Sequence, residues 1–290
     1  MSKISQDYKG ILWMIISMAA FAIEDSLIKA LSQYIPTGEI LILFGFAGAA
    51  AFAIIARLQR TPLFLLDAIS PAMRLRFLFE LFGRLFYFLA LAFTPLIATT
   101  AILQATPIVV VAGAAFFMKE KVSMKKWLAI ALGLTGVLII LQPASNDFSL
   151  VSLLAVFGML GFSGRDLASR AAPVNLSTAT LGFYGFVTVT IAGFLYTGWT
   201  QLPLIVPSKP ALMLLFSAIT IGVLAYSTLM KAMRTGAVSI VAPFRYTRMI
   251  FGIFIGVFIF GEVLSLEMIL GSLVIVISGL FLIIGNDKIK

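Results

Sequence analysis

Long apolar runs separated by short polar segments recur from one end of the chain to the other. Each run has roughly 18 to 25 residues, which at about 1.5 Å per residue is enough to cross a hydrocarbon core about 30 Å thick. A membrane β-barrel would show shorter segments of alternating hydrophobicity. The runs cover about 10–31, 37–56, 75–93, 96–118, 123–141, 149–168, 174–196, 210–230, 237–260 and 264–284. The pattern predicts an all-α membrane protein with ten transmembrane helices.

The basic residues between these runs alternate in number from one connection to the next. Cytoplasmic connections of membrane proteins carry an excess of Lys and Arg. One side of the predicted membrane holds only Lys209. The other side holds Lys3, Lys9, Arg57, Arg60, Arg74, Arg76, Lys119, Lys121, Lys125, Lys126, Arg165, Arg170, Lys231, Arg234, Lys288 and Lys290. Both termini are therefore predicted to be cytoplasmic.

The first apolar run also resembles a signal peptide, because Lys3 and Lys9 precede it and Ala20-Phe21-Ala22 could serve as a cleavage site. The same stretch has a counterpart in the middle of the chain. A signal peptide has no reason to recur there, so we interpret the run as the first transmembrane helix.

Two stretches of the first half align with stretches of the second half. "FAIEDSLIKAL" at 21–31 matches "FSGRDLASRAA" at 162–172, and "FFMKEKVSMKKWLAIALGLTGVL" at 116–138 matches "FIFGEVLSLEMILGSLVIVISGL" at 258–280. The aligned pairs are Asp25 with Asp166, Lys29 with Arg170, and Glu120 with Glu262. The shifts agree, since 166 − 25 is 141 and 262 − 120 is 142. The chain therefore reads as a repeat.

This repeat predicts two five-helix units, at 1–142 and 143–290. An odd number of spans makes the second unit enter the membrane from the opposite side, so the repeats are inverted. Inverted repeats are typical of secondary transporters, whose binding site lies near mid-membrane between the halves. A duplicated helical bundle without cargo is the alternative.

Composition removes several other classes. The chain is 61% hydrophobic and 11% charged, with a mean hydropathy of +1.10. Its formal charge of +9 is spread over the connections rather than over one solvated face, so no nucleic-acid partner is predicted; attraction to anionic lipid explains the charge. Cys and His are absent, which excludes disulfides, thiol nucleophiles and Cys/His metal sites. No metal and no cofactor are predicted.

Four basic residues fit neither side of the membrane: Lys29, Arg84, Arg245 and Arg248. Counting from the start of their spans, Arg84 lies roughly 15 Å deep, and Arg245 and Arg248 lie roughly 12 and 16 Å deep, one turn apart on one face. Three central arginines cost roughly 7–10 kcal/mol unless something neutralises them. They are therefore expected to face an internal cavity.

Candidate counter-charges come from two spans. Glu80 lies four residues before Arg84, and Glu24 and Asp25 lie within reach of Lys29. Such pairs can also serve only to lock helices together, and both interpretations stay open. The span of Arg245 and Arg248 has no nearby acidic residue, so it predicts an excess positive charge that a cargo carboxylate or phosphate could meet.

Prolines and tyrosines accompany these charges. Pro107 lies midway along the fourth span and Pro243 near the start of the ninth, where each removes a backbone hydrogen bond and kinks its helix. Tyr87 and Tyr246 flank the arginines along the sequence. They are candidates for the cavity wall.

Two stretches carry a family resemblance: "LALAFTPLIATTAILQATPIVVVAGAAFFMKEKVS" at 89–123 and "VAPFRYTRMIFGIFIGVFIFGEVLS" at 241–265. With their mid-span Pro and terminal Glu, they resemble the drug/metabolite transporter superfamily, in particular the EamA-type family and its amino-acid exporters of the YddG type. The resemblance implies a ten-helix carrier built of two inverted five-helix units around a central cavity, exporting aromatic or other neutral amino acids. Lys119 replaces the Gly that is common before the terminal Glu, which alters a turn and not the cavity.

Together these observations predict a secondary-active or facilitative exporter of small zwitterions. The cargo carboxylate would meet Arg84, Arg245 or Arg248, and its ammonium Glu80, Glu24 or Asp25, with Glu80 as the proton carrier if export is proton-coupled. The partners are a small-molecule cargo and the lipid bilayer, and the oligomeric state is left open. Alternatives are a carrier of phosphorylated or nucleotide-linked sugars, drug efflux, and a membrane-embedded enzyme, for which no catalytic constellation is found. A phosphate-binding loop for ATP is absent from the sequence.

Overall fold

The computed structural model describes residues 3–119, 122–142, 149–170, 173, 176–235 and 241–284. Over these residues the chain forms helices and connections only, with no strand. The α-helices are α1 Lys3–Leu31, α2 Thr37–Leu58, α3 Pro71–Phe93, α4 Leu96–Leu103, α5 Thr106–Phe117, α6 Met124–Leu141, α7 Leu153–Arg170, α8 Thr178–Thr200, α9 Lys209–Thr235, α11 Thr247–Phe258 and α12 Leu266–Ile284. Three short 3-10 helices are η1 Leu66–Ile69, η2 Leu150–Ser152 and η3 Ala242–Tyr246. The helices follow the predicted apolar runs, because a bilayer offers no partner for an unpaired backbone group.

Seven segments of the described chain are long and apolar enough to cross a membrane. They comprise α1, α2, α4 with α5, α6, α7, α8 and α9. The helix α3 is long enough but carries Arg74, Arg76, Glu80 and Arg84, and α11 has only 12 residues. The apolar stretch of α12, Leu266–Phe281, is shorter than a full span. For these last three elements, membrane crossing stays a prediction.

Two of the predicted spans are broken helices. The fourth is divided into α4 and α5 at Gln104 and Ala105, one turn before Pro107, which lies in the first turn of α5. The ninth contains the 3-10 helix η3 before α11. Proline accounts for the first break as predicted, since it cannot donate the backbone hydrogen bond that would continue α4. The predicted turn residue Glu120 lies outside the described residues.

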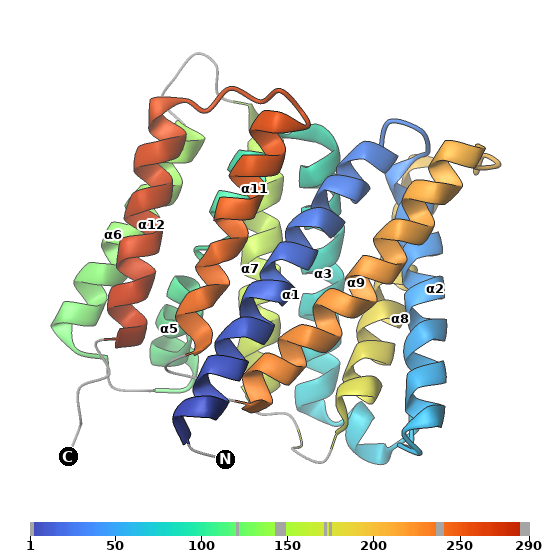
Figure 1. Cartoon of the computed structure of the whole chain (residues 1–290), viewed down its shortest axis with the longest axis horizontal. Helices are drawn as coiled ribbons and strands as arrows, with labels where there is room; N and C mark the ends of the chain where they lie inside the picture. Colours follow the sequence, from blue (N-terminus) through green and yellow to red (C-terminus); the bar gives the residue numbers. More distant parts are fainter. Residues whose placement is uncertain are drawn as a thin grey trace.

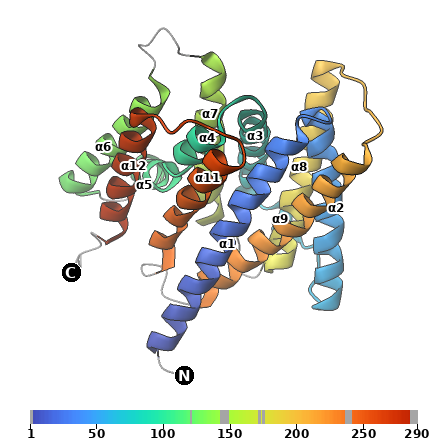
Figure 2. The same cartoon turned by 45° about the horizontal axis from the view of Figure 1, so that its top comes forward.

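The helices pair across the two halves of the sequence. Figures 1 and 2 show α1 lying along α9, α2 beside α8, and α6 beside α12, and α3 packs against α7. The repeat matches each helix of the first half with the helix six numbers later, so that α1 matches α7, α2 matches α8, α3 matches α9 and α6 matches α12. Under this match the pair α1–α9 becomes the pair α7–α3. The pairs α2–α8 and α6–α12 are each converted into themselves. The packing is therefore unchanged when the halves are exchanged.

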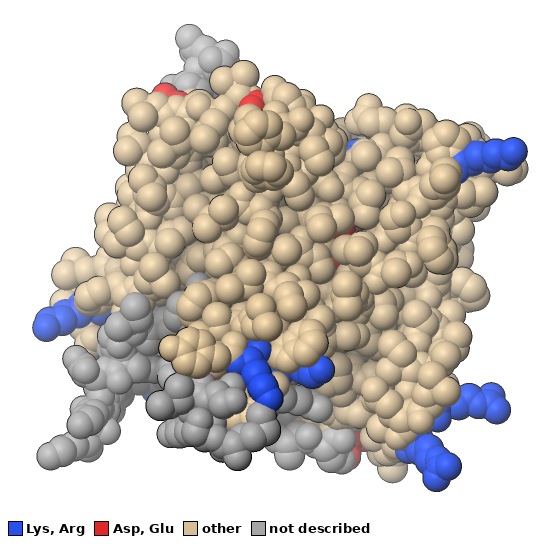
Figure 3. All heavy atoms as spheres, in the orientation of Figure 1, with Lys and Arg blue, Asp and Glu red and all other residues tan. Residues whose placement is uncertain are grey.

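The outside of the bundle is apolar. Phe46, Phe64 and Phe216 are each more than two-thirds exposed, which suits a surface that faces lipid tails. Figure 3 shows a face whose middle has almost no charged side chains, with most of its basic side chains in the lower part and one group at the upper right. In the same orientation, α1 begins and α12 ends at the lower side (Figure 1). Both ends of the described chain therefore lie on one side of the molecule, and their orientation in a membrane stays a prediction.

Candidate functional site

A group of buried and partly buried charged side chains lies where α1, α3, α7 and α11 meet. We call it the charged cluster, and its members are Glu24, Asp25, Arg76, Glu80, Arg84, Arg165, Asp166 and Arg248. Four of these side chains are basic and four acidic, so the formal charges cancel. Burying a charge is costly unless an opposite charge and hydrogen bonds accompany it, and the cluster supplies both.

The residue spacing along α3 builds one side of the cluster. Arg76, Glu80, Arg84 and Tyr87 follow at intervals of three or four residues and so share one face of the helix. The opposite face carries exposed apolar side chains such as Leu78. As a result α3 presents its polar stripe to α1 and α7 and its apolar stripe outward.

A close helix crossing brings α7 to this stripe. A Cβ atom on Gly161 would collide with the backbone of Gly83, so only glycine permits the two helices to approach this far. Directly beyond the crossing, Phe162 of α7 receives the guanidinium of Arg165 over its ring at 4.7 Å and that of Arg84 at 5.6 Å. The crossing therefore places the charges of α7 beside those of α3.

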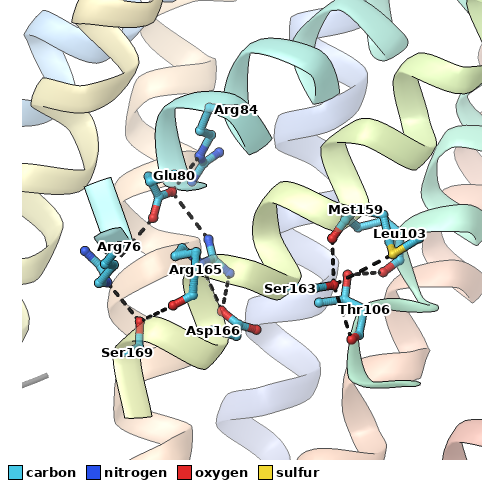
Figure 4. Close-up of polar contacts among 10 residues, drawn as sticks. All are labelled: Arg76, Glu80, Arg84, Leu103, Thr106, Met159, Ser163, Arg165, Asp166 and Ser169. Carbon is cyan, nitrogen blue, oxygen red and sulfur yellow. Dashed lines mark hydrogen bonds and ion pairs between the residues drawn. The ribbon is translucent and has the colours of Figure 1, made fainter. Parts of the chain in front are cut away.

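Glu80 is the most heavily paired carboxylate of the cluster. Its Oε1 accepts hydrogen bonds from Arg84 Nε at 3.3 Å and Arg165 Nη1 at 3.4 Å, and its Oε2 lies 3.6 Å from Arg76 Nη2 (Figure 4). Arg76 Nε in turn donates to Ser169 Oγ at 3.0 Å. Three guanidinium groups stabilise the charged form of Glu80. The sequence-based choice of Glu80 as proton carrier is therefore not supported by this arrangement.

Asp25 and Arg248 form the tightest pair. Asp25 Oδ2 accepts hydrogen bonds from Arg248 Nη2 at 2.6 Å and Nε at 3.1 Å and from the Tyr87 hydroxyl at 2.9 Å. Arg248 also stacks over the ring of Phe21 at 4.9 Å. This pair joins α1 and α3 of the first half to α11 of the second half.

Glu24, the neighbour of Asp25 in the sequence, is paired far less completely. Its Oε1 lies 3.6 Å from Arg84 Nη1. Its Oε2 is buried and has no hydrogen-bond partner within the described part of the chain. Against its carboxyl carbon lies the backbone of α9 at Gly222, where a Cβ atom would be 3.3 Å away. Glu24 is thus a buried carboxylate whose Oε2 atom lacks a hydrogen-bond donor among the described residues.

A separate polar contact joins the halves near the end of α1; we call it the Lys29–Glu262 tie. Glu262 Oε1 and Oε2 accept from the backbone N–H groups of Leu96 and Ile97 at 2.6 and 2.9 Å, and Lys29 Nζ lies 3.7 Å from Oε1. The carboxylate therefore sits at the start of α4, where helix N–H groups lack internal partners. Gly261, with φ of 65°, forms the turn that delivers Glu262.

The structure brings together six of the eight residues proposed from the sequence. The six are Arg84, Arg248, Glu80, Glu24, Asp25 and Tyr87. It does not bring in Arg245 or Tyr246. The Arg245 carbonyl accepts from Gln104 Nε2 at 3.0 Å, and the Arg245 side chain makes no ion pair with any described residue. The Tyr246 hydroxyl presses against Gly279 of α12 and has no hydrogen-bond partner among the described residues.

Two expectations about charge pairing are wrong. Arg248 carries no excess positive charge, because Asp25 reaches it from another span. Lys29 pairs with Glu262 and not with Glu24 or Asp25. The pair Glu80–Arg84 forms as predicted. The errors share one cause: the expectations searched for partners within a span, and the contacts lie between spans.

Three cluster members were missed by the sequence analysis. Arg76 and Arg165 were assigned to the cytoplasmic side, and Asp166 was named only as the repeat counterpart of Asp25, although all three bind Glu80 or one another in the charged cluster. One signal was present in the sequence: the repeat alignment sets Asp166 on Asp25, and therefore sets Arg165 on Glu24. Charged positions of the first span were thus repeated in the sixth.

The sequence predicted a cavity beside the buried arginines. Two cavities of the structure lie elsewhere. One, of about 410 Å³, lies between α11 and α12 and is bounded by apolar side chains together with Tyr246 and Thr247. The other, of about 390 Å³, lies between α2, α8 and α9. Neither is lined by a member of the charged cluster. The described residues contain no His, Cys, Asp and Glu grouping suited to a metal ion.

Comparison with known proteins gives consistent matches. The model of the EamA-like transporter family matches the chain twice, at residues 8–142 and 149–285. The S-adenosylmethionine uptake transporter of Rickettsia prowazekii is 24% identical over 286 residues, with 96% of this chain and 94% of that protein covered. The riboflavin transporter of Vibrio cholerae is 28% identical, covering 94% and 92%.

An exporter and a solved structure are also similar to this chain. A pseudopaline exporter of Pseudomonas aeruginosa is 24% identical, covering 93% of this chain and 94% of that protein. A solved structure described only as the crystal structure of a protein superposes with a TM-score of 0.64 at 16% identity, over 97% of this chain and 98% of that chain. The last likeness concerns the fold alone.

Proposed function

The chain belongs to the EamA-like transporter family, and on that premise we propose that it carries small zwitterionic metabolites, with amino acids as the first candidates, by alternating access. As a transporter of this family it is a multi-pass protein of the cell inner membrane. The proposal concerns the cargo, the site and the mechanism, including the view that the chain is a carrier and not an enzyme.

The charged cluster is the observation that carries this proposal. Its pairs Arg248–Asp25 and Arg84–Glu24 each join a guanidinium and a carboxylate from different helices. A zwitterion offers one carboxylate and one ammonium, so it can replace the internal partner on each side of an opened pair. With all eight side chains of the cluster ionised, the site has zero net charge, as a zwitterion has, so the cargo-bound site is balanced.

The same reasoning weighs against cargo with two negative charges. A phosphorylated sugar would add about two unmatched negative charges to a cluster whose formal charges already cancel. An amino acid adds none. S-adenosylmethionine, the cargo in the name of one relative, has the ammonium and carboxylate of an amino acid and also a sulfonium group, so it brings one positive charge and no negative surplus. We therefore place amino acids and their derivatives before phosphate esters.

Alternating access is proposed from the inverted repeat. The helix pairs of the two halves exchange without changing the packing. At the centre, Gln104 of the broken fourth span bonds to Arg245 of the broken ninth, and these positions are 141 residues apart, equal to the shift of the first sequence alignment. This symmetry supports two inverted five-helix units, 1–142 and 143–290, with ten spans and both termini cytoplasmic. The two units can then adopt each other's conformation in turn.

The described conformation is closed around the inner members of the cluster. The carboxylate side chains of Glu24 and Glu80 and the guanidinium of Arg84 are at most 12% exposed. Cargo can reach them only after helices separate. Opening therefore breaks ion pairs that cargo then replaces, and this exchange links binding to the conformational change.

The test is transport of labelled amino acids and S-adenosylmethionine by the purified protein in proteoliposomes. The deciding variant is the double substitution Asp25→Asn with Arg248→Gln, which removes both charges of one pair and leaves the cluster balanced. We expect a folded protein whose transport falls at least tenfold.

The matched control is Glu39→Gln, which neutralises a buried carboxylate of α2 outside the cluster that accepts from Ile205 N. It is expected to transport at the wild-type rate. If the double variant also transports at the wild-type rate, the pair only fastens helices together and the proposed site is wrong.

A further inference from the structure

We propose that Glu24 is the exchangeable carboxyl of this transporter: it holds a proton when the site is empty and releases that proton when the ammonium group of the cargo binds. The inference rests on the proposed function and names the group that couples cargo to protons. It distinguishes Glu24 from Asp25 and Glu80, which the sequence left as equal candidates for the ammonium.

The hydrogen bonding of the three carboxylates separates them. Asp25 accepts three hydrogen bonds, and Glu80 is shared by three arginines. Glu24 has one ion pair, at 3.6 Å, and an Oε2 atom without a partner among the described residues. A buried acceptor left unmet is costly, so Glu24 is the carboxyl that gains most from a new partner.

The surroundings of Glu24 limit what that partner can be. On one side the carboxyl carbon of Glu24 lies against Gly222 of α9, which the ring of Phe44 of α2 also approaches, so this side is apolar. The other groups near Glu24 are charged or polar. The charged groups that act on it are Arg84 of α3, Asp25 of α1 and Arg248 of α11, and Tyr87 and Glu80 adjoin these. No described donor reaches Oε2. A proton or an N–H group from outside the chain would satisfy it.

Charge balance explains why the proton and the ammonium group of the cargo exclude each other at Glu24. With Glu24 protonated, the cluster has four positive and three negative charges, and its surplus positive charge attracts the carboxylate of the cargo. When the ammonium arrives at Oε2, the charged form of Glu24 is stabilised and the proton leaves. The exchange is COOH plus R–NH3⁺ giving COO⁻ with bound R–NH3⁺ and one free H⁺, so charges and atoms balance. Cargo and proton would then move in opposite directions.

The experiment measures proton release on binding. Purified full-length protein is titrated with L-phenylalanine and with L-methionine by calorimetry in two buffers of different ionisation enthalpy. We expect one proton released per cargo bound, and an affinity that rises about tenfold per pH unit where Glu24 is protonated. The deaminated analogue 3-phenylpropionate lacks the ammonium and is expected to bind without releasing a proton.

Glu24→Gln is expected to release no proton, to lose the pH dependence and to bind at least tenfold more weakly at the higher pH. Glu24→Asp retains the titrating group and is expected to retain proton release, so it carries the test if Glu24→Gln does not fold. The matched control Glu39→Gln is expected to behave as the wild type, because its carboxylate lies outside the cluster.

The possible failures are distinct. If the wild type binds neither amino acid, the proposed function itself is overturned. If the wild type binds an amino acid without releasing a proton, or if Glu24→Gln releases as much as the wild type, only the role of Glu24 is overturned.

Discussion

Two of the polar contacts that join the halves of the molecule each use a glutamate, but they surround it differently. In the Lys29–Glu262 tie, a single carboxylate holds one lysine at 3.7 Å and two backbone N–H groups of α4. Between α3 and α7, Glu80 holds three arginines at 3.3 to 3.6 Å, and a serine supports one of them. We call this second group the Glu80 tie.

The difference indicates which contact opens more easily. Lysine is a flexible, strongly hydrated point charge, whereas guanidinium groups form directed and more weakly hydrated contacts. The Glu262 side chain is also more exposed than that of Glu80, at 12% against 4%. We therefore expect the carrier to open first at the Lys29–Glu262 tie while the Glu80 tie stays closed.

Removing the carboxylate of the Glu80 tie should have the largest effect. Glu80→Gln leaves three buried guanidinium groups without their shared counter-charge, and breaking a buried pair in this way costs about 3–5 kcal/mol. Thermal unfolding in detergent is expected to show the loss. An unfolding curve equal to that of the wild type would contradict the stronger role given to this tie.

Separating α3 from α7 should weaken the Glu80 tie without touching a charge. Gly161→Ala places a methyl group against the backbone of Gly83, and such overpacking costs about 1–3 kcal/mol. The control is Gly185→Ala in α8, where a Cβ atom meets nothing within 4 Å and alanine favours the helix. Equal melting temperatures for the two variants would mean that the crossing does not control the tie.

Weakening the other tie should cost less and should speed opening. Glu262→Gln keeps an oxygen for one N–H group of α4 but loses the charge that holds Lys29, a change of about 1–2 kcal/mol in the closed state. We expect faster transport or faster exposure of the site at this end. A loss of stability as large as that of Glu80→Gln would remove the distinction between the ties.

The smallest effect concerns two tyrosines. Tyr87→Phe removes a hydroxyl that donates to Asp25 and accepts from Arg248 Nη2 at 3.2 Å, and should cost about 0.5–1.5 kcal/mol. Tyr246→Phe removes a hydroxyl without a partner in the described chain and should be neutral or stabilising. Parallel melting curves of both variants would show the contrast, and the reverse order would refute the assignment of these side chains.

Most of the helical fold was predictable, because the bilayer forces every spanning segment to be an apolar helix of nearly fixed length. The break before Pro107 was also predictable, since proline cannot continue the backbone ladder. The disturbance at Pro243 in the ninth span was predictable for the same reason, and η3 contains this proline. Its 3-10 geometry was not predictable, because a missing backbone hydrogen bond does not specify which type of helix replaces the α-helix. The short α11 follows from that break.

The sequence predicted which charged residues lie deep in the membrane, but it did not predict which residues they pair with. Depth in the membrane identified Arg84 and Arg248, since a buried charge is costly whatever it touches. The partner of Arg248 depends on how α1 packs against α11, and no local pattern encodes that contact. Arg245, three residues earlier, was grouped with Arg248 on one face, but it lies in η3, where the helix has not yet reached α-helical geometry.

The central claim is that the charged cluster lies on a path that opens to one side of the membrane. The chain contains no cysteine, so a single Ser163→Cys can be labelled without background. Ser163 is buried in α7, donating to the Met159 carbonyl one turn from Asp166. In proteoliposomes, a membrane-impermeant maleimide should label this cysteine at a rate that changes when cargo is added. Ser278→Cys, equally buried between α6 and α12, should stay unlabelled. Absence of labelling at position 163 under transport conditions, or equal labelling at both positions, would contradict the claim.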